Sequence, residues 1–204
     1  MQFTRPDMRE ITISDKSEAC DFIKDSCKEC NRKYECTGEN AAFCNHMKNI
    51  LVAKYGAAEG CLKESRIRHS IGVANFLFAY AKSHDWSKEE TEDLYLTGLL
   101  HDIGYIDNPK GTDHGRLGAE ILKRNGLNAE ICELISCHGR FIENPSRKQA
   151  LLWLADLCVN RDGDYIGYQK RYERIKERYK NDPERLFQVY RILEYLQIHF
   201  SEYR

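Results

Sequence analysis

Three observations predict an all-α fold for this chain. Apolar residues recur at spacings of three and four in several segments, two segments open with a capping-box pattern, and no convincing run of residues predicts strands. The chain has 204 residues, enough for one well-packed core with a small additional segment. We therefore expect a helical array over residues 61–204, preceded by a separate segment at 1–60.

Composition and charge exclude several classes of protein. The 42% hydrophobic and 31% charged residues are typical of an ordinary globular protein. A formal net charge of −1 gives no overall field that would attract nucleic acid or an anionic membrane. The sequence shows neither a signal peptide nor a long apolar run. We expect a cytoplasmic protein with no membrane partner and no strong nucleic-acid signal.

Cysteines set the first 60 residues apart. The chain has nine cysteines, and in a reducing compartment they are expected to be thiols or metal ligands rather than disulfides. Cys27 and Cys30 have the spacing of a metal-binding loop, and Cys36 and Cys44 could complete a tetrahedral site, with His46 as a substitute for one thiolate. Zinc, an iron–sulfur cluster and unligated thiols all fit this spacing, so the three interpretations remain open.

Helical periodicity is clearest after residue 60. The capping boxes begin at Ser87 and Ser146, Asp113 is a candidate N-cap, and Asp182-Pro183 is typical of a helix start. The spacing of apolar residues predicts helices over 41–55, 66–82, 87–101, 113–125, 129–138, 146–156 and 182–200.

Five of these helices carry a side chain that can bind metal on an otherwise apolar face. His101-Asp102 follows an apolar run directly, and Asp156 interrupts the run 151–155, where an unpaired carboxylate would be costly. Any one such histidine could simply be a satisfied core residue, but five coincidences in one array favour a common centre. The predicted ligands are His69, His101, Asp102, His114, His138 and Asp156.

Four imidazoles and two carboxylates suit two divalent transition metals that keep open positions for water. Asp102 is the expected bridge, because a carboxylate can bind one metal through each of its oxygens. Iron, manganese and zinc are the candidate ions.

The motifs around these residues resemble the HD superfamily of metal-dependent phosphohydrolases. The resemblance rests on Arg68-His69-Ser70, Leu100-His101-Asp102-Ile103-Gly104 and Ala155-Asp156, and it covers about 66–175. The additional His114 and His138 resemble the binuclear branches, and their placement is most similar to the HD-type dinucleoside-tetraphosphate hydrolases.

A second branch fits less well. The HD-GYP cyclic-dinucleotide phosphodiesterases share a histidine before Gly-Ala-Glu-Ile-Leu, but they have a His-His pair where this chain has Cys137-His138. The Gly-Tyr-Pro motif of that branch is also absent from the sequence. Both differences argue against cleavage of cyclic dinucleotides.

The resemblance implies hydrolysis of a phosphoester or phosphoanhydride in a nucleotide or other small phosphorylated metabolite by a metal-activated water. His101 and Asp102 are the residues expected at the centre of catalysis. The side chains that could contact phosphate are Arg66, Arg68, Lys110, Arg140 and Arg161.

Two other functions remain open. Some HD-fold proteins are oxygenases that use the same ligands for a di-iron centre, and the cysteine-rich segment keeps redox chemistry possible. The domain could also be a non-catalytic sensor or interaction module that binds a partner through the basic helix expected at 169–180. Such a run of charges is more typical of a solvated helix face.

Overall fold

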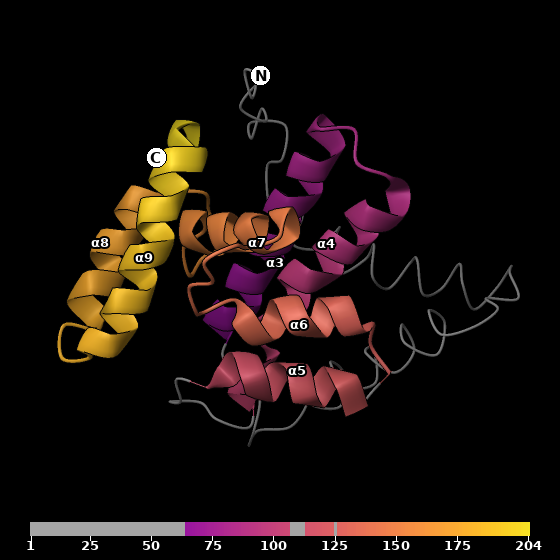
Figure 1. Ribbon diagram of the computed structural model, residues 1–204, viewed down its shortest axis with the longest axis horizontal. Coiled ribbons are helices and arrows are strands. Elements are labelled where there is room, and N and C mark those ends of the chain that lie inside the picture. Colours follow the sequence, from indigo (N-terminus) through magenta and orange to yellow (C-terminus); the bar gives the residue numbers. More distant parts are fainter. Residues whose placement is uncertain (1–63, 107–112, 125) are drawn as a thin grey trace, which may run out of the picture.

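The computed structural model describes residues 64–106, 113–124 and 126–204, and this part of the chain is helical (Figure 1). The prediction of an all-α fold is confirmed, since a single β-bridge, Val159 to Tyr165, is the only strand-like pairing in these ranges. None of the described helices has the length and apolar character needed to cross a membrane. The elements are α3 Glu64–Ser83, α4 Lys88–Leu100, η1 Ile103–Ile106, α5 His114–Arg124, α6 Ala129–Cys137, α7 Arg147–Cys158, α8 Tyr168–Arg178, α9 Pro183–His199 and η2 Ser201–Tyr203.

Local side-chain contacts determine where several helices begin. Before α4, Ser87 Oγ accepts a hydrogen bond from Glu90 N over 3.2 Å, and Glu90 Oε2 accepts one from Ser87 N over 3.1 Å, so this predicted capping box is complete. Asp182 caps α9 by accepting from Arg185 N over 3.1 Å, with Pro183 in the first turn.

The capping box predicted at Ser146 forms only in part. Ser146 Oγ accepts from Gln149 N over 3.1 Å, but the Gln149 side chain is buried. With its amide oriented to suit its neighbours, Gln149 donates to Leu134 O and accepts from Trp153 Nε1, each over 3.3 Å. The prediction was wrong for Gln149 because the core offers this amide two partners that the sequence spacing does not reveal.

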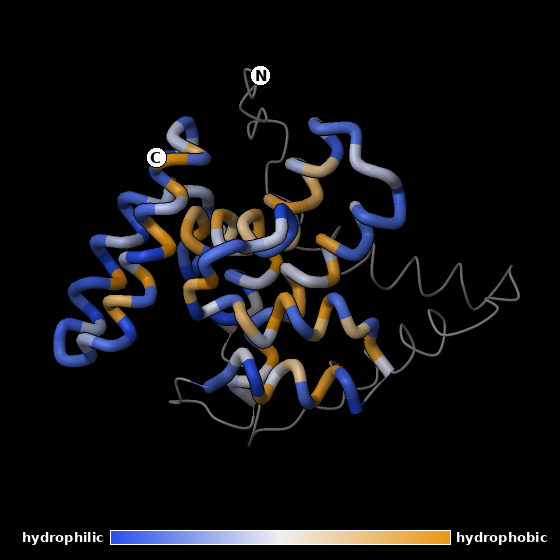
Figure 2. The backbone as a smooth tube through the Cα atoms, in the orientation of Figure 1, coloured by the Kyte–Doolittle hydropathy of each residue, from blue (hydrophilic) through white to orange (hydrophobic). Residues whose placement is uncertain are grey.

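The central helix of the domain is α7, which contacts α3, α4, α6, α8 and α9. Residues 150–155 of this helix are almost completely buried, and Asp156, which follows them, is half-buried. Around α7 the other helices pack as the pairs α3–α4, α5–α6 and α8–α9 (Figure 1). Long hydrophilic stretches lie on α8 and α9 (Figure 2). The helix that carries Asp156 is therefore fixed from several sides.

Close approach of α3 and α4 depends on Gly98. A Cβ atom at this position would lie 2.8 Å from Ala74 N and Ala74 Cα on α3. With no side chain there, the two helices pack tightly, and the end of α4 is held beside α3. This packing brings His101 next to His69.

Candidate metal centre

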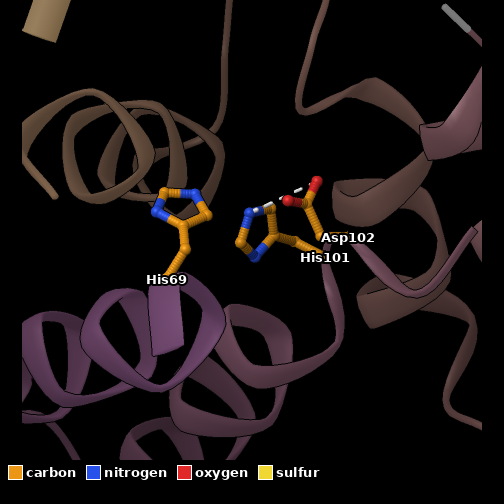
Figure 3. Close-up of side chains that lie close together, drawn as sticks. All are labelled: His69, His101 and Asp102. Carbon is orange, nitrogen blue, oxygen red and sulfur yellow. Dashed lines mark ion pairs between the residues drawn. The ribbon is translucent and has the colours of Figure 1, made fainter. Parts of the chain in front are cut away.

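The side chains of the six predicted ligands lie around one buried point. His69 points toward His101 and Asp102 in Figure 3, although it comes from a different helix. Each residue occupies a fixed place relative to a helix: His69 is on α3, His101 and Asp102 directly follow α4, His114 begins α5, His138 follows α6, and Asp156 is on α7.

His101 and His138 are oriented by the same local arrangement. Each is the C-cap residue of its helix, and each Nδ1 lies 2.7 Å from the carbonyl oxygen three residues earlier, Gly98 O and Ile135 O respectively. A carbonyl only accepts, so Nδ1 carries the hydrogen and donates it. In the neutral ring, Nε2 then offers its lone pair to the centre, as a metal ligand must.

The Nε2 atom of His101 is a buried polar atom without a hydrogen-bond partner among the described residues. It lies 3.7 Å from Asp102 Oδ1 and 3.9 Å from Asp156 Oδ1. Burial lowers the pKa of His101 to about 4, so the ring is neutral at physiological pH. A neutral imidazole nitrogen between two carboxylates fits a divalent cation.

His69 is held in the same way from a different element. Its Nδ1 lies 3.1 Å from Asn160 O, in the turn after α7, and its Nε2 lies 2.9 Å from Asp156 Oδ1. Burial opposes ionisation of Asp156, yet the neighbouring His69 and His101 lower the pKa of this carboxyl group. Asp156 therefore remains an anion.

His114 and His138 form the other side of the centre. Their Nε2 atoms are 2.9 Å apart, and they lie 3.4 Å and 3.6 Å from Asp102 Oδ1. Burial and the neighbouring His138 lower the pKa of His114 to about 3. Burial acts against protonation of His138 as well, but the Asp102 carboxylate outweighs it and raises the pKa of His138.

Asp102 stands between the two groups of histidines. Arg66 Nη1 donates to its Oδ2 over 2.5 Å, which leaves Oδ1 facing the histidines. Burial opposes ionisation here, but His101, His138 and Arg66 together hold the pKa of Asp102 well below its usual value. The carboxylate is therefore charged and available for coordination.

Three overlapping groups of ligand atoms, each within 4.8 Å of one another, could hold a metal ion. Their nitrogen and carboxylate oxygen donors are those that divalent transition metals take. The groups are His69 with His101 and Asp102, His101 with His138 and Asp156, and Asp102 with His114 and His138.

Comparison with known proteins identifies the family of the domain. The model of the HD domain family matches residues 66–190, more than half of the chain. The chain belongs to the HD domain family. This result confirms the resemblance to the superfamily of metal-dependent phosphohydrolases at the level of the family.

One curated relative is an uncharacterized protein from Methanocaldococcus jannaschii. It is 31% identical over 77 residues, which are 37% of this chain and 45% of the relative. The match thus spans less than half of the relative's length. No solved structure matches the chain significantly.

A cavity of about 360 Å³ opens at the candidate metal centre of the HD domain. Arg66 and Arg140, two of the predicted phosphate contacts, line it. Arg68 instead lies 3.9 Å from Asp162 Oδ1, and Arg161 is exposed in the turn after α7, so neither forms a wall of the cavity. Lys110 lies outside the described residues.

Four arginines that the sequence interpretation had not selected as phosphate contacts also line the cavity: Arg116, Arg171, Arg178 and Arg185. The prediction that residues 169–180 form a solvated helix face is wrong for Arg171, because only 6% of this residue is exposed. A signal was present in the sequence, since Arg171, Ile175 and Arg178 have the spacing of one helix face. The buried Ile175 shows that this face of α8 packs inward.

The second predicted metal site lies outside the described residues. It comprises Cys27, Cys30, Cys36 and Cys44, with His46 as the alternative ligand. The segment 1–60 and the helix expected at 41–55 likewise remain predictions from sequence.

Proposed function

We propose that this HD domain hydrolyses a phosphoester or phosphoanhydride bond in a nucleotide or another small phosphorylated metabolite. The observation that carries the proposal is the sharing of Asp102 by two ligand groups at the wall of an arginine-lined cavity. Metal ions and guanidinium groups both neutralise phosphoryl oxygens, so their combination suits phosphoryl transfer.

Two divalent ions of iron, manganese or zinc are proposed for the centre. His69, His101, Asp102 and Asp156 would hold one ion, and Asp102 with His114 and His138 would hold the other. Such ions, when bound, lower the pKa of a coordinated water and neutralise charge on the phosphoryl group.

The residues of the chain prepare this site before any ligand arrives. Hydrogen bonds from Nδ1 to backbone carbonyls fix the rings of His101 and His138, so neither of these rings needs to reorient. The low pKa of His101 means that a metal ion meets no competing proton on this ring at neutral pH. Arg66 holds Asp102 in place, and Arg140 at the cavity wall is proposed to contact the phosphate of the substrate.

The arginine-lined cavity favours a phosphohydrolase over a di-iron oxygenase or a non-catalytic module. Dinucleoside polyphosphates are the first compounds to test, because the positions of His114 and His138 in the sequence resemble those of the tetraphosphate hydrolases.

The test begins with full-length protein stripped of metal and reloaded separately with Mn²⁺, Fe²⁺ or Zn²⁺. Release of phosphate or a nucleotide product is then measured on a panel of phosphoesters and phosphoanhydrides, with oxygen consumption recorded in parallel. We expect hydrolysis that requires added metal and is lost in His114→Ala and Asp156→Asn. Oxygen consumption without hydrolysis would establish the oxygenase instead.

A further inference from the structure

Arg171 on α8 is a buried charge that the proposed hydrolysis does not explain. It lines the cavity although only 6% of it is exposed, and its Nε atom is buried with no hydrogen-bond partner in the described part of the chain. A guanidinium does not lose its proton under ordinary conditions, so burying it without a partner is costly. An anion bound in the cavity would remove that cost.

The nearest carboxylates are engaged elsewhere. Asp156 and Asp102 attract Arg171 electrostatically, but no ion pair joins Arg171 to either of them within the described ranges. Asp156 lies 2.9 Å from His69, and Asp102 lies 2.5 Å from Arg66. Both carboxylates are proposed metal ligands, so a bound cation would take up much of their remaining charge.

Arg178 and Arg185 line the cavity together with Arg171, and they come from α8 and α9, which pack against each other. Arg178 lies seven residues further along α8, on the same helix face. Arg185 comes from α9, where its Nη2 donates to Tyr105 Oη over 3.2 Å and its guanidinium carbon lies 4.0 Å from the centre of the Tyr179 ring. These contacts fix Arg185 through aromatic groups and leave its charge without a carboxylate partner among the described residues.

Other arginines of the cavity differ in this respect. Arg116 forms ion pairs with Asp113 and Glu120, and Arg66 pairs with Asp102. Apart from Arg140, which the proposed function assigns to the substrate phosphate, the cavity arginines without an ion pair among the described residues lie on α8 and α9. Ile175 and Ile192, both buried, also line this α8–α9 wall.

We infer that Arg171, Arg178 and Arg185 form a binding site for a second phosphate group of the substrate, one that is not cleaved. The inference rests on the proposed function, because it assigns the reacting phosphate to the metal centre. The same cavity reaches both places, so one small molecule could occupy them together. The substrate would then carry at least two phosphates, and the α8–α9 wall would select for the second.

Phosphate binding to metal-free protein tests the site apart from catalysis. Full-length protein treated with a chelator is titrated calorimetrically with inorganic phosphate and with pyrophosphate, at about 0.15 M NaCl to screen nonspecific attraction. We expect Arg171→Met and Arg185→Met to weaken binding of both probes at least tenfold. Arg171→Lys, which keeps the charge but loses the planar donors, should bind with intermediate affinity.

Arg174→Met is the matched control. Arg174 lies on the same helix and is exposed, and it does not line the cavity, so its removal changes the net charge equally. This variant should bind both probes as the wild type does. Equal weakening by Arg171→Met and Arg174→Met, or unchanged binding by Arg171→Met, would overturn the site.

Thermal unfolding separates a binding role from a structural one. If Arg171 serves an anion, Arg171→Met removes an unpaired buried charge and the melting temperature stays the same or rises. A fall in melting temperature together with unaltered phosphate affinity would mean that the residue supports the fold instead. If the wild type hydrolyses nothing but binds phosphate through Arg171, the proposed function fails and the anion site stands. If the wild type hydrolyses a substrate but Arg171→Met binds phosphate as the wild type does, the proposed function stands and the anion site is ruled out.

Discussion

Arg66 donates a hydrogen bond to Asp102 across 2.5 Å and takes the one carboxylate oxygen that does not face the histidines. The same guanidinium lies 3.4 Å from the centre of the Tyr105 ring, which in turn stacks on His114. An ion that bound Asp102 through Oδ2 would therefore have to displace Arg66. Oδ1, which faces the histidines, would take part in a ligand set without such a displacement.

The first prediction concerns the loss of this partner. Arg66→Met leaves a buried carboxylate without its cation, so the metal-free protein should lose about 3 kcal/mol of stability. Added Mn²⁺ or Zn²⁺ should raise the melting temperature of Arg66→Met more than that of the wild type, because the metal replaces the missing charge. Arg116→Met is the control, since its partners Asp113 and Glu120 are exposed. If added metal raised the melting temperature of Arg66→Met and of the wild type equally, the main role of Arg66 would not be to pair with Asp102.

The second prediction concerns Asp102 itself. Asp102→Asn keeps the side-chain volume but removes the charge that lies within 3.7 Å of His101, His114 and His138, histidines that belong to different ligand groups. Metal stoichiometry, measured by elemental analysis, and hydrolysis should fall together, while circular dichroism shows a folded protein. Asp162→Asn removes an exposed carboxylate near Arg68 and should change neither quantity. Normal metal content with wild-type hydrolysis in Asp102→Asn would rule out Asp102 as the bridge.

The third prediction uses the contact between η1 and α5. A Cβ at Gly104 would press against the carbonyl group of His114 and lie 2.5 Å from Gly118 N. Gly104→Ala should therefore push α5 outward, lower stability by about 1–3 kcal/mol and weaken metal binding through His114. Gly139→Ala, next to His138, is the matched control because its Cβ would meet nothing within 4 Å. Denaturant unfolding and metal titration check both variants.

The fourth prediction is a pH dependence of the metal-free protein. Burial lowers the pKa of His101 to about 4 and that of His114 to about 3, against an ordinary value of 6.5. Between pH 6.5 and 4 the unfolded chain binds these protons and the folded protein does not, so the stability that these groups provide is lost as the pH falls. Each such proton changes the free energy of unfolding by about 1.4 kcal/mol per pH unit. The raised pKa of His138 acts in the opposite sense above pH 6.5.

Denaturant unfolding of chelator-treated protein at pH 4.5, 5.5 and 6.5 measures this slope. His114→Gln removes one of the titrating groups and should flatten it. A stability that does not change over this range in the wild type would show that the two rings are not kept neutral by burial.

The fifth prediction concerns the cysteine-rich segment. If Cys27, Cys30, Cys36 and Cys44 hold an ion, full-length Asp102→Asn protein should retain zinc or iron after it has lost the metal of the HD centre. Replacing the four cysteines with serine in that background should remove the remainder. Protein made under reducing conditions that contains neither metal would leave these residues as free thiols.

The sequence determined the helices of the described part of the chain and most of their ends. Helix formation depends on contacts between residues three and four apart, and the capping pattern at Ser87 and the Asp182-Pro183 start are equally local. The six candidate ligands could be found for the same reason, because each lies on an apolar helix face or directly at the end of an apolar helix. Even the orientation of His101 and His138 is local, since each ring bonds a carbonyl three residues earlier.

Only the tertiary structure determined which charged and polar groups are partners. The pairing of Arg66 with Asp102 spans 36 residues, and the amide of Gln149 turns into the core toward Leu134 and Trp153. The spacing within 169–180 places Arg171 on the same helix face as Ile175, but Arg171 is buried only because α8 packs against α7 and α9. Long-range packing sets the cost of each buried charge, so the arrangement of anion and cation sites follows from the assembled helices rather than from any one of them.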